Sequence, residues 1–298
     1  MSTEARIRRA LYLHGLFDLD TAPFAASARI VYHYCDWEAA TGILKERQFW
    51  ATEYDCMKDT TEIRAADAVT LDVAQQLRTT ATGLAADVLA DFITDYPNKH
   101  VTKVVPVFLS CFSVARDDPN QWIEYAAGGK GVCLGIPSLS EPQPDNEPLN
   151  LMRVAVNYSE TEWRAKVTDQ FSKALAAMNR EAPLKRHSVW ALFVIALLVA
   201  VSAKRADLFA EQEVRVLGIG RRGGPQPDVR ERQKDGRTIR YVRLNVRQRD
   251  KRIALTEIIV GPNQDANEGC HRAQQILENA GYTPDAAEYP RIVPCAAR

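Results

Sequence analysis

The sequence predicts an α+β fold, in which short strands near both ends of the chain form a sheet and long helices lie between them. β-branched and aromatic residues mark a buried strand over residues 28–35. A capping-box pattern, Asp59-Thr-Thr-Glu62, opens a long helix that we expect to end near Pro97. Strands at both ends with helices between them are typical of α+β proteins and not of a regular βαβ alternation.

The remaining elements follow from the same signals along the chain. Apolar residues recur at helical spacing in residues 36–46, and the acidic, proline-rich stretch 138–148 is expected to be a loop. Pro106 indicates an edge position or a kink in the strand that contains it. Further strands are expected over 49–54, 104–114, 131–136, 151–158, 212–219, 238–246 and 254–260, and further helices around Trp122 and Tyr125, within 159–205 and over 267–280.

The chain shows no internal repeat and no linker long enough to separate two domains. We therefore expect residues 1–298 to form a single domain. Residues 1–28 would form an N-terminal helical extension, and the helical segments 59–97 and 159–205 would pack on the sheet.

Composition indicates an ordinary globular protein of the cytoplasm. Lys and Arg number 38 and Asp and Glu number 38, so no overall field attracts nucleic acid or acidic membranes. The N-terminus lacks the apolar region of a secretory signal. The six cysteines show neither C-x-x-C pairs nor zinc-finger spacing, so we expect reduced core thiols and no metal site.

An unbroken apolar run covers Val189 to Val201, with basic residues on both sides. A membrane-spanning helix needs about 20 apolar residues, and shorter runs are typical of buried core helices. The run therefore predicts a central helix packed on all sides, and no membrane contact is expected.

Two further patterns concern phosphate binding. Residues 218–223 match G-x-G-x-x-G, but the prolines at 225 and 227 prevent the helix that a dinucleotide-binding turn requires. Residues 221–252 contain twelve Lys or Arg and four Asp or Glu, a local excess of +8. This basic hairpin either contacts the phosphates of a nucleic acid or dinucleotide, or is a solvated surface whose arginines pair with acids elsewhere.

Residues 209–216 carry the pattern with the most chemical content. On a strand, alternation would place Glu211, Glu213 and Arg215 on one face, with the two carboxylates about 7 Å apart. A surface charge ladder explains the same pattern. His33, on an early apolar strand between Tyr32 and Tyr34, is either a satisfied core histidine or a site residue.

A His or Arg on the first strand, a Ser, Thr or aromatic position on a middle strand and a Glu on a late strand is the order found in ADP-ribosyltransferases. The nicotinamide of NAD is already a cationic leaving group, so cleavage needs no general acid. The ribose develops oxocarbenium character, as in glycoside hydrolysis. One carboxylate stabilises that charge while other side chains position the nicotinamide riboside.

Five short segments, in order, resemble a bacterial domain-of-unknown-function family that includes abortive-infection proteins of the AbiGi type. They span most of the chain. Lys58 and Cys35 depart from the residues usual in that family, Asn and Thr respectively. The segments are Tyr32-His33-Tyr34, Phe49-Trp-Ala-Thr52 with Asp59-Thr-Thr-Glu62, Cys111-Phe-Ser113 with Trp122, Tyr125 and Gly131-Val-Cys-Leu-Gly135, Glu211-Gln-Glu213-Val-Arg215, and Ile258-Ile-Val-Gly261-Pro262.

The resemblance and the motif order imply an ADP-ribosyltransferase-like split sheet, mixed or antiparallel, with flanking and inserted helices. They also imply a glycosyltransferase that cleaves NAD and acts as an antiviral defence effector or toxin. Glu213 would be the catalytic carboxylate, Glu211 would orient the nucleophile and His33 would contact the ribose. The NAD-binding residues would be His33, Tyr34, Thr52, Tyr54, Trp122, Tyr125 and Arg215.

The partners expected on this reading are NAD and a macromolecular acceptor, either protein or nucleic acid. Two other functions stay open. One is a metal-dependent nuclease or phosphodiesterase that uses Asp59, Glu62 and Glu213 around Mg²⁺. The other is a non-catalytic sensor that binds a nucleotide.

Overall fold

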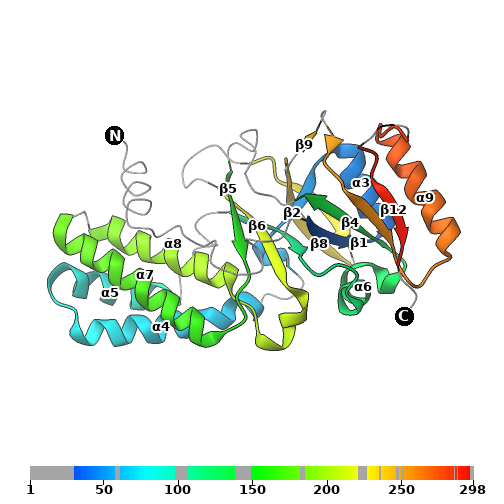
Figure 1. Cartoon of the computed structure of the whole chain (residues 1–298). Helices are drawn as coiled ribbons and strands as arrows, with labels where there is room; N and C mark the ends of the chain where they lie inside the picture. The colour runs from blue at the N-terminus through cyan, green and yellow to red at the C-terminus, as the bar shows by residue number, and fades with distance from the viewer. Residues whose placement is uncertain are drawn as a thin grey trace. The chain divides into compact units, whose positions relative to one another are not determined.

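The computed structural model describes residues 30–57, 61–97, 106–137, 149–181, 185–220, 227–234, 236–245, 248–249, 252–284, 286 and 288–295. Within these ranges the chain forms two compact units (Figure 1). The helical unit holds the described parts of 57–106 and 154–209, and the sheet unit holds those of 23–56, 107–153 and 210–298. The single domain expected from the sequence is thus divided into two compact parts. The expected N-terminal extension over 1–28 lies outside the described residues.

Four helices lie side by side in the helical unit (Figure 1). The ring of Phe92 lies 5.3 Å from that of Phe171 and 5.2 Å from that of Phe193. The helix expected over 59–97 is broken, because Thr82 begins a new helix and Gly83 takes a left-handed φ of 57°. The helical segments expected over 59–97 and 159–205 form α4 (Thr61–Thr80), α5 (Gly83–Asp95), α7 (Glu160–Glu181) and α8 (Lys185–Ser202). These four helices pack against one another.

The apolar run 189–201 lies within α8 and is buried along most of its length, as predicted for a core helix. Ala196 and Ala200, on successive turns, are both 0% exposed. Among the described residues, none of the helices combines the length and the apolar character needed to cross a bilayer.

The sheet unit contains a ten-stranded mixed sheet within the described residues. The strand order is β12-β11-β4-β1-β3-β2-β8-β7, and β6 pairs with both β3 and β5. The pair β11 and β12 is parallel, and the other pairs with a described register are antiparallel. The coarse prediction of mixed helices and strands is confirmed. The strands are β1 (Ile30–Cys35), β2 (Phe49–Glu53), β3 (Val107–Ser113), β4 (Val132–Pro137), β5 (Asn150–Ala155), β6 (Glu213–Ile219), β7 (Arg230–Lys234), β8 (Arg237–Leu244), β11 (Glu257–Val260) and β12 (Arg291–Pro294).

The sheet forks at β3. One edge of β3 pairs with β6 along its whole length, while the other edge pairs with β1 at Ser113 and with β2 at Leu109. Directly paired residues of a ladder point to the same face, and successive residues alternate. Tyr32, Ser113 and Glu213 therefore share one face, named here the Glu213 face, and His33 and Phe112 share the opposite one, the His33 face.

The His33 face carries the main apolar core. Two helices pack against it, α3 (Trp37–Glu46) and α9 (Ala266–Asn279). The helical spacing predicted for 36–46 is confirmed, because its apolar positions are the buried ones, namely Trp37, Ala40, Ile43 and Leu44.

On the Glu213 face, the short helix α6 (Pro119–Tyr125) contributes Trp122 to a smaller cluster with Tyr32, Tyr34 and Cys133.

Two glycines allow close backbone approach beside this cluster. A Cβ atom at Gly131 would lie 2.2 Å from the carbonyl oxygen of Cys35, and one at Gly261 would lie 2.3 Å from that of Gly129. Neither position accommodates a side chain without a backbone shift. Close packing of the backbone thus explains the glycines at positions 131 and 261.

Candidate functional site

Glu213 and Arg215 form a buried ion pair at the start of β6. The guanidinium donates from Nε to Oε1 of Glu213 at 2.8 Å and from Nη2 to Oε2 at 3.0 Å. The side chains are 6% and 1% exposed. Both charges are therefore removed from water and compensated by a two-point contact. The expected placement of these two residues on one face is confirmed.

Glu211 does not continue this strand. It ends the short 3-10 helix η5 (Ala206–Glu211), and Gln212 has a left-handed φ of 43°. The alternation that was to align Glu211 with Glu213 therefore stops at Gln212, and that part of the prediction is wrong. The Glu211 carboxylate accepts a hydrogen bond from the Tyr125 hydroxyl at 3.3 Å, and its carbonyl accepts one from Ser113 Oγ at 2.6 Å.

A row of directly paired residues crosses the Glu213 face. Tyr32 on β1 pairs with Ser113 on β3, and Ser113 pairs with Glu213 on β6. Neighbouring strands are about 4.8 Å apart, so the outer two backbones are separated by about 10 Å. The row continues on the other side of Tyr32 through Gly135 to Glu257. Three strands far apart in sequence thus place an aromatic, a hydroxyl and a carboxylate side by side.

The far end of this row is a second buried acid. Glu257 is 1% exposed and accepts hydrogen bonds from Tyr32, Arg116 and Arg291. The Arg116 hydrogen bonds lower the pKa of the Glu257 carboxyl, against the opposing effect of burial. Burial, followed by the Glu257 charge, raises the pKa of Tyr32 to about 12. Tyr32 therefore keeps its proton at physiological pH.

His33 does not reach this site. Its ring packs on the other side of the sheet, 5.2 Å from the ring of Phe49 and 5.4 Å from that of Phe112. Nδ1 donates to the Cys111 carbonyl at 2.9 Å, and burial lowers the pKa of the imidazole. The expected convergence of His33 and Glu213 on one pocket is wrong, because the β1 register turns Tyr32, and not His33, toward Glu213.

Tyr34 and Trp122 hold the loop between β3 and α6. The Tyr34 hydroxyl donates to the Ala115 carbonyl at 2.9 Å and accepts from the Asp118 amide at 3.0 Å. Trp122 packs edge-on against Tyr34 and donates from Nε1 to Asp117 at 2.8 Å. Both rings lie on the Glu213 face, and their polar atoms bond within the loop.

Thr52 and Tyr54 lie farther from Glu213. Thr52 pairs with Leu109, four residues along β3 from Ser113, which is about 13 Å at the usual rise per residue. Tyr54 follows β2 in a 3-10 turn, and its side chain is buried. The structure thus brings together Glu211, Glu213, Arg215 and Tyr125 from the expected set, and leaves His33, Thr52 and Tyr54 apart.

Two members of the row were not assigned a role from the sequence. Ser113 stands in the Cys111-Phe-Ser113 segment, and Tyr32 stands beside the histidine that was chosen instead. The missing information was register, because shifting one strand by one residue exchanges the faces of all its side chains.

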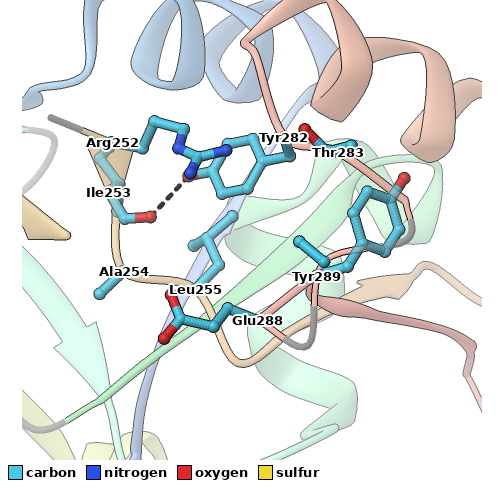
Figure 2. A pocket seen from close by; sticks show the side chains of 9 residues that line it. Arg252, Ile253, Ala254, Leu255, Tyr282, Thr283, Glu288 and Tyr289 are labelled. Atoms are coloured by element: carbon cyan, nitrogen blue, oxygen red, sulfur yellow. Dashed lines mark hydrogen bonds between the residues drawn. The ribbon is translucent and has the colours of Figure 1, made fainter. Parts of the chain in front are cut away.

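A pocket of about 260 Å³ lies elsewhere in the sheet unit (Figure 2). Tyr282, Tyr289, Leu255 and Glu288 are among its lining residues, with Arg252, whose guanidinium carbon lies 5.3 Å from the centroid of the Tyr282 ring. The Tyr282 hydroxyl donates to the Ile253 carbonyl at 2.5 Å. None of the predicted site residues lines this pocket.

The alternative metal site is not assembled within the described chain. Asp59 lies outside the described residues, and so does the side chain of Glu62. Among the side chains that are described, no group of three or more His, Cys, Asp or Glu residues is placed to hold a metal ion.

Comparisons of the chain with protein-family models, with curated proteins and with solved structures found no match. The family resemblance and its implied activity therefore stay predictions. What the structure adds is the geometry of the Glu213 face.

Proposed function

We propose that the chain cleaves NAD and transfers ADP-ribose to a macromolecular acceptor, with Glu213 as the carboxylate at the reacting ribose. The observation that carries this proposal is the row Tyr32, Ser113 and Glu213 across three paired strands. Two positions of the order that the sequence motifs suggested are kept, the middle-strand hydroxyl and the late-strand glutamate, and Tyr32 stands where that order has a His or Arg. In the structure, Tyr32 takes the position expected for His33, and Ser113 takes the position expected for Thr52. The fork of the sheet at β3 supports the proposed split-sheet architecture.

The proposed reaction uses few groups. The bond between ribose C1′ and the nicotinamide nitrogen breaks, its electron pair neutralises the nicotinamide, and positive charge develops on the ribose. The Glu213 carboxylate stabilises that charge. A nucleophile of the acceptor then bonds C1′ and loses its proton to a carboxylate, a role we assign to Glu211.

Tyr125 is the exposed aromatic residue near Glu211 and Glu213. It is 42% exposed, and its hydroxyl bonds Glu211 at 3.3 Å. A partly exposed ring beside a buried carboxylate suits stacking on the nicotinamide while Glu211 stays oriented. The left-handed Gln212 holds the backbone between the two glutamates in a costly conformation, as is common where a site is preorganised.

The test is nicotinamide release from labelled NAD, measured by chromatography. The wild-type chain should release nicotinamide, and Glu213→Gln should lower the rate about 100-fold or more, the size typical of losing one electrostatic group. Because Gln carries no charge and leaves Arg215 without its counter-ion, Glu213→Asp serves as a second variant that keeps the charge and displaces the carboxylate. The matched control is Glu53→Gln. Glu53 pairs with Phe108 on β3 and therefore points to the His33 face, where it forms an ion pair with Arg240.

A role as a phage-defence effector or toxin is proposed from the family resemblance. Expression of the wild-type chain should slow bacterial growth, and Glu213→Gln should relieve the effect at equal protein level. If the Glu213→Gln variant were as toxic as the wild-type chain, growth inhibition would not depend on the Glu213 carboxylate.

One observation favours a second function, a non-catalytic nucleotide sensor. Both Glu213 oxygens accept hydrogen bonds from Arg215, which reduces the negative charge available to a substrate. On this alternative NAD would raise the melting temperature without being consumed. Stabilisation by NAD with no nicotinamide release would therefore favour the sensor.

A further inference from the structure

We propose that β7, β8 and Trp50 form a binding surface for single-stranded nucleic acid on the Glu213 face of the sheet. The proposal deepens the proposed function by naming the acceptor class. Its test uses neither NAD nor Glu213, so the two can fail separately.

The register places this surface on the Glu213 face. Arg230 on β7 pairs with Tyr241 on β8, Tyr241 pairs with Thr52 on β2, and Thr52 pairs with Leu109 on β3. Leu109 and Ser113 are four residues apart on one strand, so their side chains point to the same face. The two rows cross β3 about 13 Å apart, and they share a face. Glu213 lies one strand to one side of β3, and Arg230 lies three strands to the other side.

Arg232 is the centre of the surface. Its guanidinium carbon lies 4.9 Å from the centroid of the Trp50 ring and 5.7 Å from that of Tyr241. Its Nε is buried and makes no hydrogen bond within the described chain, and no described carboxylate forms an ion pair with it. A guanidinium fixed on two aromatic rings and lacking an anionic partner is prepared to receive a phosphate.

Arg230 and Arg243 add further positive charge to the surface around Arg232. Arg243 is 29% exposed and lies 3.9 Å from its nearest carboxylates, on Glu46 and Asp228, which is too long for a hydrogen bond. Arg230 pairs more closely with Asp228, which is itself 74% exposed. By register, the described arginines on this face are Arg230, Arg232, Arg237 and Arg243, and the carboxylates beside them are those of Asp228 and Glu46, so four positive charges face two negative ones. The local field therefore favours a polyanion.

Trp50 is the ring on this surface that favours a single strand over a duplex, because Tyr241 beside it is only 8% exposed. The two ring centroids are 5.3 Å apart, between the arginines of β7 and β8. Surfaces that combine arginines with aromatic rings on a sheet hold unpaired bases by stacking and the backbone by charge. Duplex DNA hides its base faces and offers only phosphates and groove edges to such a surface.

The experiment is fluorescence anisotropy of the full chain with a labelled mixed-sequence 12-mer at two or more salt concentrations. Binding should weaken with salt, and Arg232→Gln should lower the affinity about tenfold and reduce the salt slope by about 0.7. Trp50→Leu should weaken binding of the single strand more than that of the duplex. Thermal unfolding of each variant checks that it is folded.

The matched control is Arg240→Gln. Arg240 lies on the same strand, pairs with Glu231 on β7 and points to the opposite face, where it forms an ion pair with Glu53. It should change the affinity less than twofold. Three results would overturn the proposal: no binding at low salt, an equal loss from Arg240→Gln and Arg232→Gln, or equal affinity for poly-glutamate of matched charge.

Discussion

Tyr32 and His33 are adjacent in sequence, and their side chains lie on opposite faces of the forked sheet. Tyr32 pairs with Ser113 and shares the face of Glu213, while His33 packs between Phe49 and Phe112. The strand register thus decides which residue of the Tyr-His-Tyr segment is available to a site. It is the reason that we centre the proposed chemistry on Glu213 without an imidazole.

The Glu213–Arg215 pair predicts a stability effect that needs no activity. Arg215→Met leaves a buried carboxylate without its guanidinium and should cost about 3–5 kcal/mol of unfolding free energy. The double variant Glu213→Leu with Arg215→Met removes both charges and should recover most of that loss. Urea unfolding of the four proteins in a double-mutant cycle measures the coupling. Additive losses would show that the pair is not coupled.

His33 predicts a pH dependence of stability. Burial lowers the pKa of its imidazole from the ordinary value of 6.5. Below that value the unfolded chain binds a proton that the folded chain does not, so this contribution to stability falls as the pH drops. His33→Asn keeps a donor for the Cys111 carbonyl and should flatten the change between about pH 7.5 and about pH 5. An unchanged pH profile would contradict the assigned burial.

Glu257 predicts the acid sensitivity of the other end of the row. Its pKa is lowered from the ordinary value of 4.5, chiefly by Arg116. Its contribution is therefore present above that value and is lost as the pH falls through the folded pKa. Glu257→Gln should cost about 1–2 kcal/mol at neutral pH, at the low end because Arg116 and Arg291 are 45% and 72% exposed. Urea unfolding near neutral pH and near pH 3 should show a smaller pH effect in the variant.

Tyr34 predicts a local effect on α6. Tyr34→Phe removes the hydroxyl that bonds both the Ala115 carbonyl and the Asp118 amide. Leaving these groups without a partner should cost about 1–3 kcal/mol. Because Asp118 caps α6, amide hydrogen exchange should accelerate in residues 119–125 more than in α9. Equal acceleration in both helices would indicate global destabilisation instead.

Local patterns predicted much of the fold. The apolar spacing in α3, the buried run in α8 and the β-branched residues of β1 are patterns that can each be recognised within a single segment of the sequence. Short strands without an apolar alternation were missed. β7 reads Arg-Glu-Arg-Gln-Lys and is an edge strand, so one of its ladders is absent and neither face has to be apolar.

The candidate site was predicted less well, because it depends on pairing between distant strands. Glu213 and Arg215 were placed correctly by strand alternation alone. Glu211 was misplaced because Gln212 adopts a left-handed backbone conformation, which a glutamine in the sequence does not predict. Tyr32, Ser113 and Glu213 meet only through the registers of β1, β3 and β6, which no single segment encodes.

The most direct test compares one variant on each face of the sheet for nicotinamide release from NAD. Glu213→Gln and His33→Asn are assayed in parallel, at temperatures where unfolding curves show both proteins to be folded. We predict that Glu213→Gln loses release and that His33→Asn keeps a rate close to wild type. Loss of release in His33→Asn with retention in Glu213→Gln would contradict the assignment of the site to the Glu213 face.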